Sequence, residues 1–263
     1  MPKTTTRVFD LSGKSVGKIE LPIIFATPIR PDVIKRAVLA IQSSNIQPQG
    51  RDPMAGKRTT AESRGTGSGI ARVPRIKGGS GKAAFAPGTV HGRAGHPPTS
   101  EKRILKHISK KEKRLALRSA IAATASKELV VARGHAVEDV PEIPLIVTND
   151  WEKLKKTKDV EAALTQLGIL SDIYRVRESR KVRAGKGKFR GRKMKQAVGP
   201  ILVVAEDKGI GEAAQNIPGV DVVEVSNLNA EDLAPGTHPG RLAIWTNGAI
   251  EKLQALHGKG EEE

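Results

Sequence analysis

The chain of 263 residues contains no cysteine. This absence excludes disulfides, thiolate zinc sites and cysteine nucleophiles together. Only oxygen and imidazole groups are left for metal binding or catalysis, and the six His residues are scattered singly along the sequence. No Gly-x-Ser-x-Gly motif marks a serine nucleophile, although the members of a Ser, His and Asp triad can lie far apart in a sequence.

Long apolar runs are also missing. No run reaches the roughly 18 residues that a membrane-spanning helix requires. The first residues, MPKTTTRVFDLSGK, lack the apolar centre of a signal peptide. We therefore expect a cytoplasmic protein with no membrane partner.

Acidic residues are scarce relative to basic ones. The chain has 45 Lys and Arg against 28 Asp and Glu, which gives a net charge of +17. Such an excess favours a polyanionic partner, with nucleic acid as the first candidate and an anionic membrane surface as the second.

The alternation of expected elements predicts the fold class. A hairpin is expected over residues 7–21 around a Ser12-Gly13 turn, and a helix from Pro31 to about Ser44. Further strands are expected at 143–147, 173–176, 201–205, 220–225 and 242–246. Further helices are expected at 101–107, after a Ser109 cap, and at 151–154, 160–167 and 250–256. This pattern is typical of an α/β domain with a mainly parallel sheet covered by helices on both faces, which is a Rossmann-like arrangement.

Residues 45–100 interrupt the pattern and show neither a helical nor a strand period. The stretch is rich in Gly, Pro, Ser and Thr and has too little apolar surface to form a core. It divides one expected globular domain, residues 1–44 and 101–263, into two parts. A loop of this length is either functional or a linker, and both remain open. Its cations favour an arm that binds nucleic acid, since a linker needs no bias of charge. They are Arg51, Lys57, Arg58, Arg64, Arg72, Arg75, Lys77, Lys82 and Arg93.

A second basic segment spans residues 175–195, where eleven cations face Glu178 alone. We expect it to bind phosphates. The expected contacts in this segment are Lys181, Arg183, Lys186, Lys188, Arg190, Arg192 and Lys193. Only Phe85 and Phe189 in the two basic stretches can stack on bases, which disfavours a single-strand platform and favours phosphate and sugar contacts with folded RNA. The cationic face of the helix after Ser109 is either a further contact or an ordinary solvated surface.

Two glycine-rich segments resemble nucleotide-binding motifs. Residues 209–214 follow an expected strand as a dinucleotide fingerprint does, but Glu206 and Asp207 would repel a pyrophosphate. Residues 78–82 resemble a phosphate loop, but Ala83 replaces the Ser or Thr that would hold magnesium. A plain turn and a flexible segment explain these residues better, so no cofactor is expected. The alternative hypothesis is a nucleotide-dependent enzyme that acts on RNA.

Two His residues, His91 and His96, lie in the 45–100 stretch without a carboxylate beside them. A metal site is therefore not expected. His residues in such loops are more often RNA contacts or neutral surface groups, and His96 is expected to contact RNA.

Several short motifs together resemble a known family along nearly the whole chain. They are DPMAGKRT at 52–59, AES at 61–63, VP at 73–74, GHPP at 95–98, RSAIAATA at 118–125 and DLAPG at 232–236. The combination resembles the archaeal and eukaryotic branch of the universal ribosomal large-subunit protein L-four family.

The resemblance implies a non-enzymatic constituent of the large ribosomal subunit, a ribonucleoprotein of translation. The partners that it implies are large-subunit ribosomal RNA, neighbouring ribosomal proteins and the nascent polypeptide. It further implies that the extended loop runs through the RNA to the wall of the polypeptide exit tunnel. The residues that correspond to the tunnel-lining tip are Arg64, Gly65, Thr66, Gly67, Ser68, Gly69 and Arg72.

Overall fold

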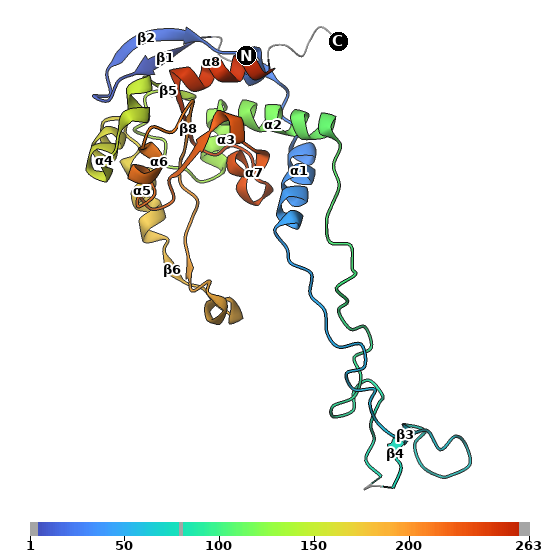
Figure 1. Ribbon diagram of the computed structural model, residues 1–263. Coiled ribbons are helices and arrows are strands. Elements are labelled where there is room, and N and C mark those ends of the chain that lie inside the picture. The colour runs from blue at the N-terminus through green and yellow to red at the C-terminus, as the bar shows by residue number, and fades with distance from the viewer. Residues whose placement is uncertain (1–4, 79–80, 258–263) are drawn as a thin grey trace. The chain divides into compact units, whose positions relative to one another are not determined.

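The computed structural model describes residues 5–78 and 81–257 (Figure 1). Its contacts divide the chain into two compact units, residues 1–41 with 107–263 and residues 42–106. We call the first unit the body and the second the inserted loop.

A six-stranded sheet forms the centre of the body, in the order β2-β1-β5-β10-β8-β9. Its strands are β1 (Thr5–Phe9), β2 (Ser15–Glu20), β5 (Leu145–Val147), β8 (Ile201–Val204), β9 (Asp221–Glu224) and β10 (Ala243–Thr246). The β1–β2 pair is antiparallel, and the other neighbouring pairs are parallel. The prediction of a mixed α/β chain with a mainly parallel sheet is confirmed.

The two faces of the sheet build two separate cores. Successive side chains of a strand point to opposite faces. In β5, Leu145 and Val147 therefore enter one core while Ile146 enters the other. All residues of β5, β8 and β10 are buried, which explains why these strands are continuous apolar runs without alternation.

Helices cover both cores. The first core receives side chains from α3 (Lys127–Ala132), the 3-10 helix η2 (Asn149–Lys153), α4 (Thr157–Gln166), α5 (Leu170–Glu178) and α6 (Ile210–Ala214). The second receives side chains from the 3-10 helix η1 (Ile23–Ala26), α1 (Pro31–Ser44), α2 (Lys110–Thr124), α7 (Ala230–Leu233) and α8 (Asn247–His257). Two short 3-10 turns, η4 (Val225–Asn227) and η5 (Pro235–Thr237), flank α7.

Start signals in the sequence fix the first turns of the helices from which the inserted loop departs and to which it returns. Pro31 occupies the first turn of α1, as predicted. Ser109 accepts a hydrogen bond from the amide of Glu112 at 3.2 Å and begins α2, also as predicted. The Glu112 carboxylate pairs at 2.8 Å with Arg36 of α1. The two helices are thus joined to each other within the body.

Two predicted elements are wrong. Residues 101–107 form no helix, because their apolar side chains find no core and Leu105 is 63% exposed. Residues 173–176 form no strand and lie in α5. There Ile173 and Val176, three residues apart, share one helix face and pack into the first core.

The parallel strands do not follow the strand order of the dinucleotide-binding fold. Their order across the sheet is β1, β5, β10, β8, β9, so the last strand in the chain lies in the middle. The doubly wound fold instead has the order 3-2-1-4-5-6.

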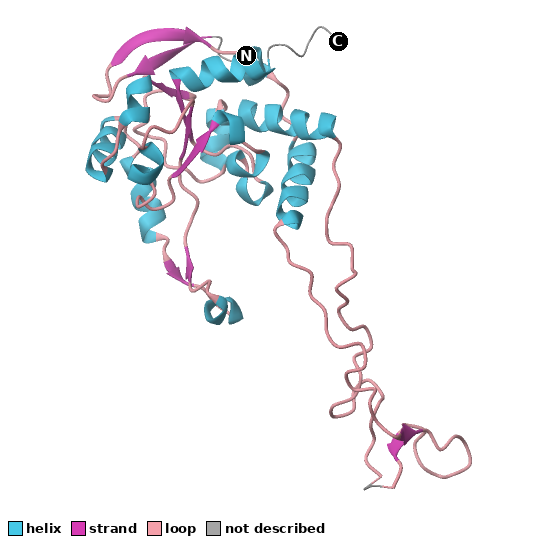
Figure 2. Cartoon of the chain, viewed as in Figure 1, coloured by secondary structure: helices cyan, strands magenta, loops and turns pink. Residues whose placement is uncertain are grey.

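The inserted loop has almost no regular structure (Figure 2). Among its described residues, the one strand pair is β3 (Ala61–Glu62) with β4 (Arg75–Ile76). Ser43 is the only buried residue among its described residues. The loop therefore has no hydrophobic core of its own.

Candidate nucleic-acid interface

The outgoing and returning arms of the inserted loop contact each other at three levels. Next to the body, the amide of Lys106 donates to Ser43 Oγ at 3.0 Å. Farther along, a side-chain carbon at Gly50 would lie 3.2 Å from the amide nitrogen of Ser100. At Gly56, with φ of +75°, a side-chain carbon would lie 2.6 Å from the backbone of Gly92 and Arg93 in the returning arm. Glycine therefore permits the close approach of the two arms.

Beyond these contacts the chain forms a closed turn around β3 and β4. Ser63 Oγ donates to the carbonyl of Arg72 at 2.8 Å and closes the segment between them. Within that segment Gly65, Gly67 and Gly69 have φ of 71°, 89° and 65°. Nothing lies within 4 Å of where their side chains would be. The predicted tip residues are thus all exposed, with Arg64 and Arg72 at its two ends.

A second turn follows β4. The Arg75 guanidinium donates to the carbonyl of Gly81 at 2.8 Å, and the amide of Ala84 donates to the carbonyl of Pro74 at 2.9 Å. One nitrogen of Arg75 therefore holds the loop backbone, and its side chain is half-buried. Of residues 78–82, in which the sequence resembles a phosphate loop, residues 79 and 80 lie outside the described part of the chain.

The returning arm contains a tight turn around Phe85. Phe85 and His91 have φ of 67° and 58°, which non-glycine residues rarely adopt. The amide of Arg93 donates to the carbonyl of Phe85 at 3.2 Å, and the Arg93 guanidinium lies 5.6 Å from the Phe85 ring centroid. This cation–π contact places the predicted RNA contact Arg93 against the turn, while His96 is exposed.

Two of the predicted contacts in the loop have carboxylate partners. Arg58 forms a two-pronged ion pair with Asp52, and Lys77 pairs with Glu62. The Arg58 guanidinium, with the amide of Met54, holds the pKa of Asp52 below its usual value. Within residues 5–78 and 81–257, no ion pair reaches the remaining exposed cations of the predicted set. They are Arg51, Lys57, Arg64, Arg72 and Lys82.

The second basic segment contains a small hairpin, residues 181–195, which we call the basic hairpin. It consists of β6 (Lys181–Val182), the 3-10 turn η3 (Lys186–Arg190) and β7 (Met194–Lys195). Arg183 is half-buried, and its Nε donates to the carbonyl of Arg192 at 3.0 Å. The other predicted contacts in the hairpin are exposed, namely Lys181, Lys186, Lys188, Arg190, Arg192 and Lys193.

A buried ionic cluster holds the base of the basic hairpin. The Asp172 carboxylate lies 3.0 Å from His135 Nδ1 and accepts from Arg175 Nε at 2.8 Å. Arg175 also donates to the carbonyl of Val198 at 2.9 Å. Arg175 belongs to the second basic segment in the sequence, but in the structure its guanidinium forms an ion pair with Asp172. The sequence contains a signal for this ion pair, because Asp172 stands three residues before Arg175 and side chains at that spacing are neighbours on a helix.

The net charge of the protein resides entirely in the two segments just described. The inserted loop has twelve Lys and Arg against three Asp and Glu, and the basic hairpin has eight against none. The rest of the chain has twenty-five of each sign. The body outside its hairpin is therefore formally neutral, and the positive field originates from the segments with the least hydrophobic core.

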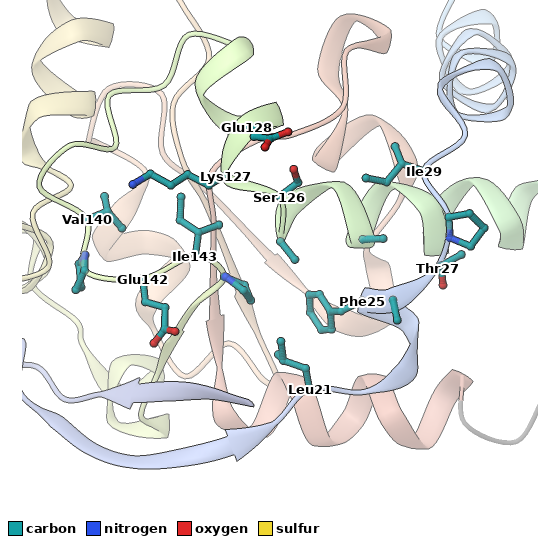
Figure 3. Close-up of a pocket in the computed structure, with 16 residues that line it drawn as sticks. Leu21, Phe25, Thr27, Ile29, Ser126, Lys127, Glu128, Val140, Glu142 and Ile143 are labelled. Carbon is teal, nitrogen blue, oxygen red and sulfur yellow. The ribbon is translucent and has the colours of Figure 1, made fainter. Parts of the chain in front are cut away.

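The body also contains a cavity. Its volume is about 620 Å³, and it is lined mainly by apolar residues, with the hydroxyl residues Thr27 and Ser126 and three charged residues, Lys127, Glu128 and Glu142 (Figure 3). No His lines it. Within residues 5–78 and 81–257, no group of three His, Asp or Glu residues could hold a metal ion. No helix in the same ranges is long and apolar enough to cross a membrane.

A comparison with known families matches residues 19–256 to the ribosomal protein L4/L1 family. The chain belongs to this family. The L4/L1 family consists of structural ribosomal proteins and not of enzymes, and the identification made from the sequence motifs is confirmed.

Curated relatives cover almost the whole chain, and each is named large ribosomal subunit protein uL4. The protein of Methanosphaera stadtmanae is 54% identical over 252 residues, which are 96% of this chain and 97% of the relative. The protein of Methanopyrus kandleri is 47% identical over 256 residues, 96% and 98% of the two chains. The protein of Saccharolobus islandicus is 48% identical over 252 residues, 95% and 94% of the two chains. These archaeal sources agree with the archaeal and eukaryotic branch of the L4 family.

At the carboxyl ends of the strands, the edge where α/β enzymes bind ligands, several polar groups of this L4-family chain are bonded to one another. There the buried Glu152 accepts from Thr246 Oγ1 at 2.9 Å. One oxygen of Asp207 accepts from the amides of Gly209 and Gly211 at 2.9 and 3.1 Å. These amides are the donors that a pyrophosphate would need. The fingerprint-like segment is therefore a self-capped turn, which disfavours the nucleotide-dependent enzyme.

Proposed function

We propose that this protein is a structural constituent of the large ribosomal subunit that binds ribosomal RNA through two surfaces. One surface is the predicted loop, residues 45–100, and the other is the second basic segment, residues 175–195. The body anchors both surfaces. It resembles a Rossmann fold in having helices on both faces of a mainly parallel sheet, but not in its strand order.

The confinement of the whole net charge to these two segments carries the proposal. A neutral body needs no polyanion, whereas seventeen excess positive charges on thin segments repel one another unless phosphates neutralise them. Each neutralised phosphate releases counterions, which gives binding that weakens steeply with salt. The preferred contacts are Arg72, Arg75, Arg190 and Arg192, because a guanidinium can grip one phosphate with two donors. In Arg75, one of these donors also holds the carbonyl of Gly81.

Ordering the loop is unfavourable by itself. Fixing the backbone of one residue costs about 1–2 kcal/mol, and the described loop residues bury almost no side chains in return. Phosphate contacts would offset this cost when RNA folds around the loop. The arm-to-arm contacts at Ser43, Gly50 and Gly56 reduce the number of conformations that the RNA must select.

The tip is proposed to form part of the wall of the polypeptide exit tunnel and to face the nascent chain. Its five central residues, 65–69, carry no charge, are all exposed and include three glycines. A thin neutral segment between Arg64 and Arg72 would not retain a passing polypeptide, while the two flanking cations bind the surrounding RNA.

Deletion of residues 51–93 tests the structural role. With a short Gly-Ser linker in their place, we expect the body to keep its far-UV circular dichroism and its cooperative unfolding. Stable incorporation into large subunits, measured by sedimentation of reconstituted particles, should be lost. Normal incorporation of the shortened protein would contradict the proposal.

A photo-crosslinking residue in place of Thr66 tests the tunnel assignment separately. In subunits of ribosomes stalled during synthesis, it should crosslink to the nascent polypeptide. The same residue in place of Lys14, in the β1–β2 turn, should give no such product. Crosslinks from position 66 to RNA alone would place the tip away from the tunnel and leave RNA binding intact.

A further inference from the structure

The basic hairpin exposes an aromatic ring that no part of the body covers. Phe189 is 82% exposed, while Tyr174, the other strongly exposed aromatic residue, is 50% exposed. Burying a ring of this kind is worth about 1.5–3 kcal/mol. Single exposed apolar residues are common on proteins, so the surroundings of Phe189 must decide whether its exposure has a use.

The backbone holds Phe189 in a defined turn. Gly185 and Gly191, with φ of 82° and 79°, stand at the two ends of η3. The amide of Arg192 donates to the carbonyl of Gly187 at 3.1 Å and closes the turn. Arg183, by donating to the carbonyl of Arg192, fixes it to the two strands. The ring is thus presented at the end of the hairpin by specific hydrogen bonds.

The charge around the ring favours a polyanion. The hairpin has eight cations and no acid, and none of its described side chains forms an ion pair with a carboxylate within residues 5–78 and 81–257. Lys188 Nζ lies 5.4 Å from the Phe189 ring centroid. A protein that covered the ring would have to neutralise these cations as well. A nucleic acid supplies a phosphate and an aromatic face in every residue.

The geometry of RNA limits which of its parts can reach the ring. Bases of an A-form helix are stacked, and its deep major groove is closed to side chains. An unpaired base in a loop or bulge presents a free face, and every base can stack on an aromatic side chain.

We propose that Phe189 stacks on an unpaired base of folded large-subunit RNA while Lys186, Lys188 and Arg190 bind the phosphates on either side. The inference rests on the proposed RNA-binding function and adds a base contact to it. The basic hairpin then recognises a local unpaired site, whereas phosphate contacts alone would accept any exposed backbone.

Binding of the full chain to transcribed large-subunit RNA, measured over a series of KCl concentrations, tests the inference. Replacing Phe189→Ala should weaken binding roughly 10-fold to 100-fold, as expected for one lost stack, with an unchanged slope of log Kd against log salt. Phe189→Leu should behave like Phe189→Ala, and Phe189→Trp should bind like the original protein. Arg190→Ala should instead reduce the slope by about one.

The outcomes separate the two proposals. If the original protein shows no salt-dependent binding, the proposed function and this inference both fail. If it binds and Phe189→Ala binds equally well, or if Phe189→Leu restores full affinity, only the stacking is overturned. Because Phe189 lies outside both cores, its substitution should leave the unfolding midpoint unchanged, which circular dichroism verifies.

Ultraviolet crosslinking in assembled subunits gives a second readout. The peptide that contains Phe189 should crosslink to a nucleotide that chemical probing identifies as unpaired. A crosslink to a paired nucleotide, or to a neighbouring protein, would overturn the inference.

Discussion

At the scale of single residues, Asp172 shows how one buried carboxylate positions a surface feature. Its carboxylate contacts both His135 and Arg175, and Arg175 in turn donates to the carbonyl of Val198, where the basic hairpin returns to the sheet. Burial opposes ionisation of Asp172, but hydrogen bonds from His135 and Arg175 outweigh it and hold the pKa of the carboxyl below its usual value. The ionised form is therefore stabilised in the fold.

Removing this charge should destabilise the body. We expect Asp172→Asn to lower the free energy of unfolding at pH 7 by about 3 kcal/mol, since one member of a buried pair is left without its partner. A lowered folded-state pKa stabilises above the unfolded pKa and is lost as pH falls through the folded value. The difference between the two proteins should thus shrink below about pH 4, as measured by urea unfolding. Glu161→Gln, on the exposed side of α4 and beyond its first turn, is the control and should change stability little.

Substitutions at two glycines of the inserted loop distinguish the effect of backbone strain from the effect of close packing between the arms. Gly56 and Gly65 have similar φ, 75° and 71°, but only Gly56 faces backbone atoms of the other arm. Alanine at either position should cost about 1 kcal/mol for its positive φ. We expect Gly56→Ala to weaken RNA binding and to speed hydrogen exchange of the Arg93 amide, whereas Gly65→Ala should change neither. Equal behaviour of the two variants would contradict the contact between the arms.

At the scale of elements, the first turn of α2 is unusual in its charge. Lys110, Lys111 and Lys113 lie at the helix end where the backbone dipole is positive, and Glu112 alone opposes them. Cations there are unfavourable by about 0.3–1 kcal/mol each. All three lysines are exposed, so this face is either a weak contact that adds to the two proposed RNA-binding surfaces or an ordinary solvated surface.

Exchange of one of these lysines should move stability and binding in opposite directions. Lys111→Glu is expected to raise the free energy of unfolding by about 0.5 kcal/mol or more, because the new charge complements the dipole. Its affinity for large-subunit RNA should fall. Lys14→Glu, in the β1–β2 turn, changes charge equally without a helix dipole and should leave stability unchanged. If Lys111→Glu leaves the affinity for large-subunit RNA unaltered, the lysines of the first turn of α2 form an ordinary solvated surface.

Most elements could be predicted from the sequence, and the errors have physical causes. The hairpin, α1 and the buried strands follow from turn residues, caps and apolar runs, which are local signals. Residues 173–176 were misassigned because a short apolar run fits either a strand or a helix until its partners are known. Residues 101–107 have helix-forming residues but no core to receive them. In both places the deciding contacts are distant in the chain.

The sequence also predicted where the positive charge gathers, but not how each charge is used. Nothing local distinguishes Arg58, which pairs with Asp52, from Lys57, for which no ion pair is found among the described residues. Asp172 could not be recognised as buried, since its partner His135 is 37 residues away. Charge density is a property of composition, whereas pairing depends on tertiary structure.

At the scale of the whole molecule, the two charged segments should act as additive sources of salt dependence. Each phosphate contact contributes about 0.7–0.9 to the slope of log Kd against log salt. Deletion of residues 51–93 or of residues 183–193 should each reduce the slope, and deletion of both should abolish RNA binding in 0.15 M salt while the body stays folded. Deletion of the uncharged residues 65–69 is the matched control and should preserve the slope. Strong RNA binding by the doubly deleted body would contradict the assignment.

The arms that meet at Ser43 and Lys106 have a topological consequence for ribosome assembly. Both ends of the inserted loop are covalently continuous with helices of the body, so it offers no free end to pass through an opening. A doubled chain of this kind can enter an opening only if the opening admits both strands side by side. Under the proposed function, RNA that packs closely around the loop must therefore leave room for two strands whenever the protein enters or leaves the subunit.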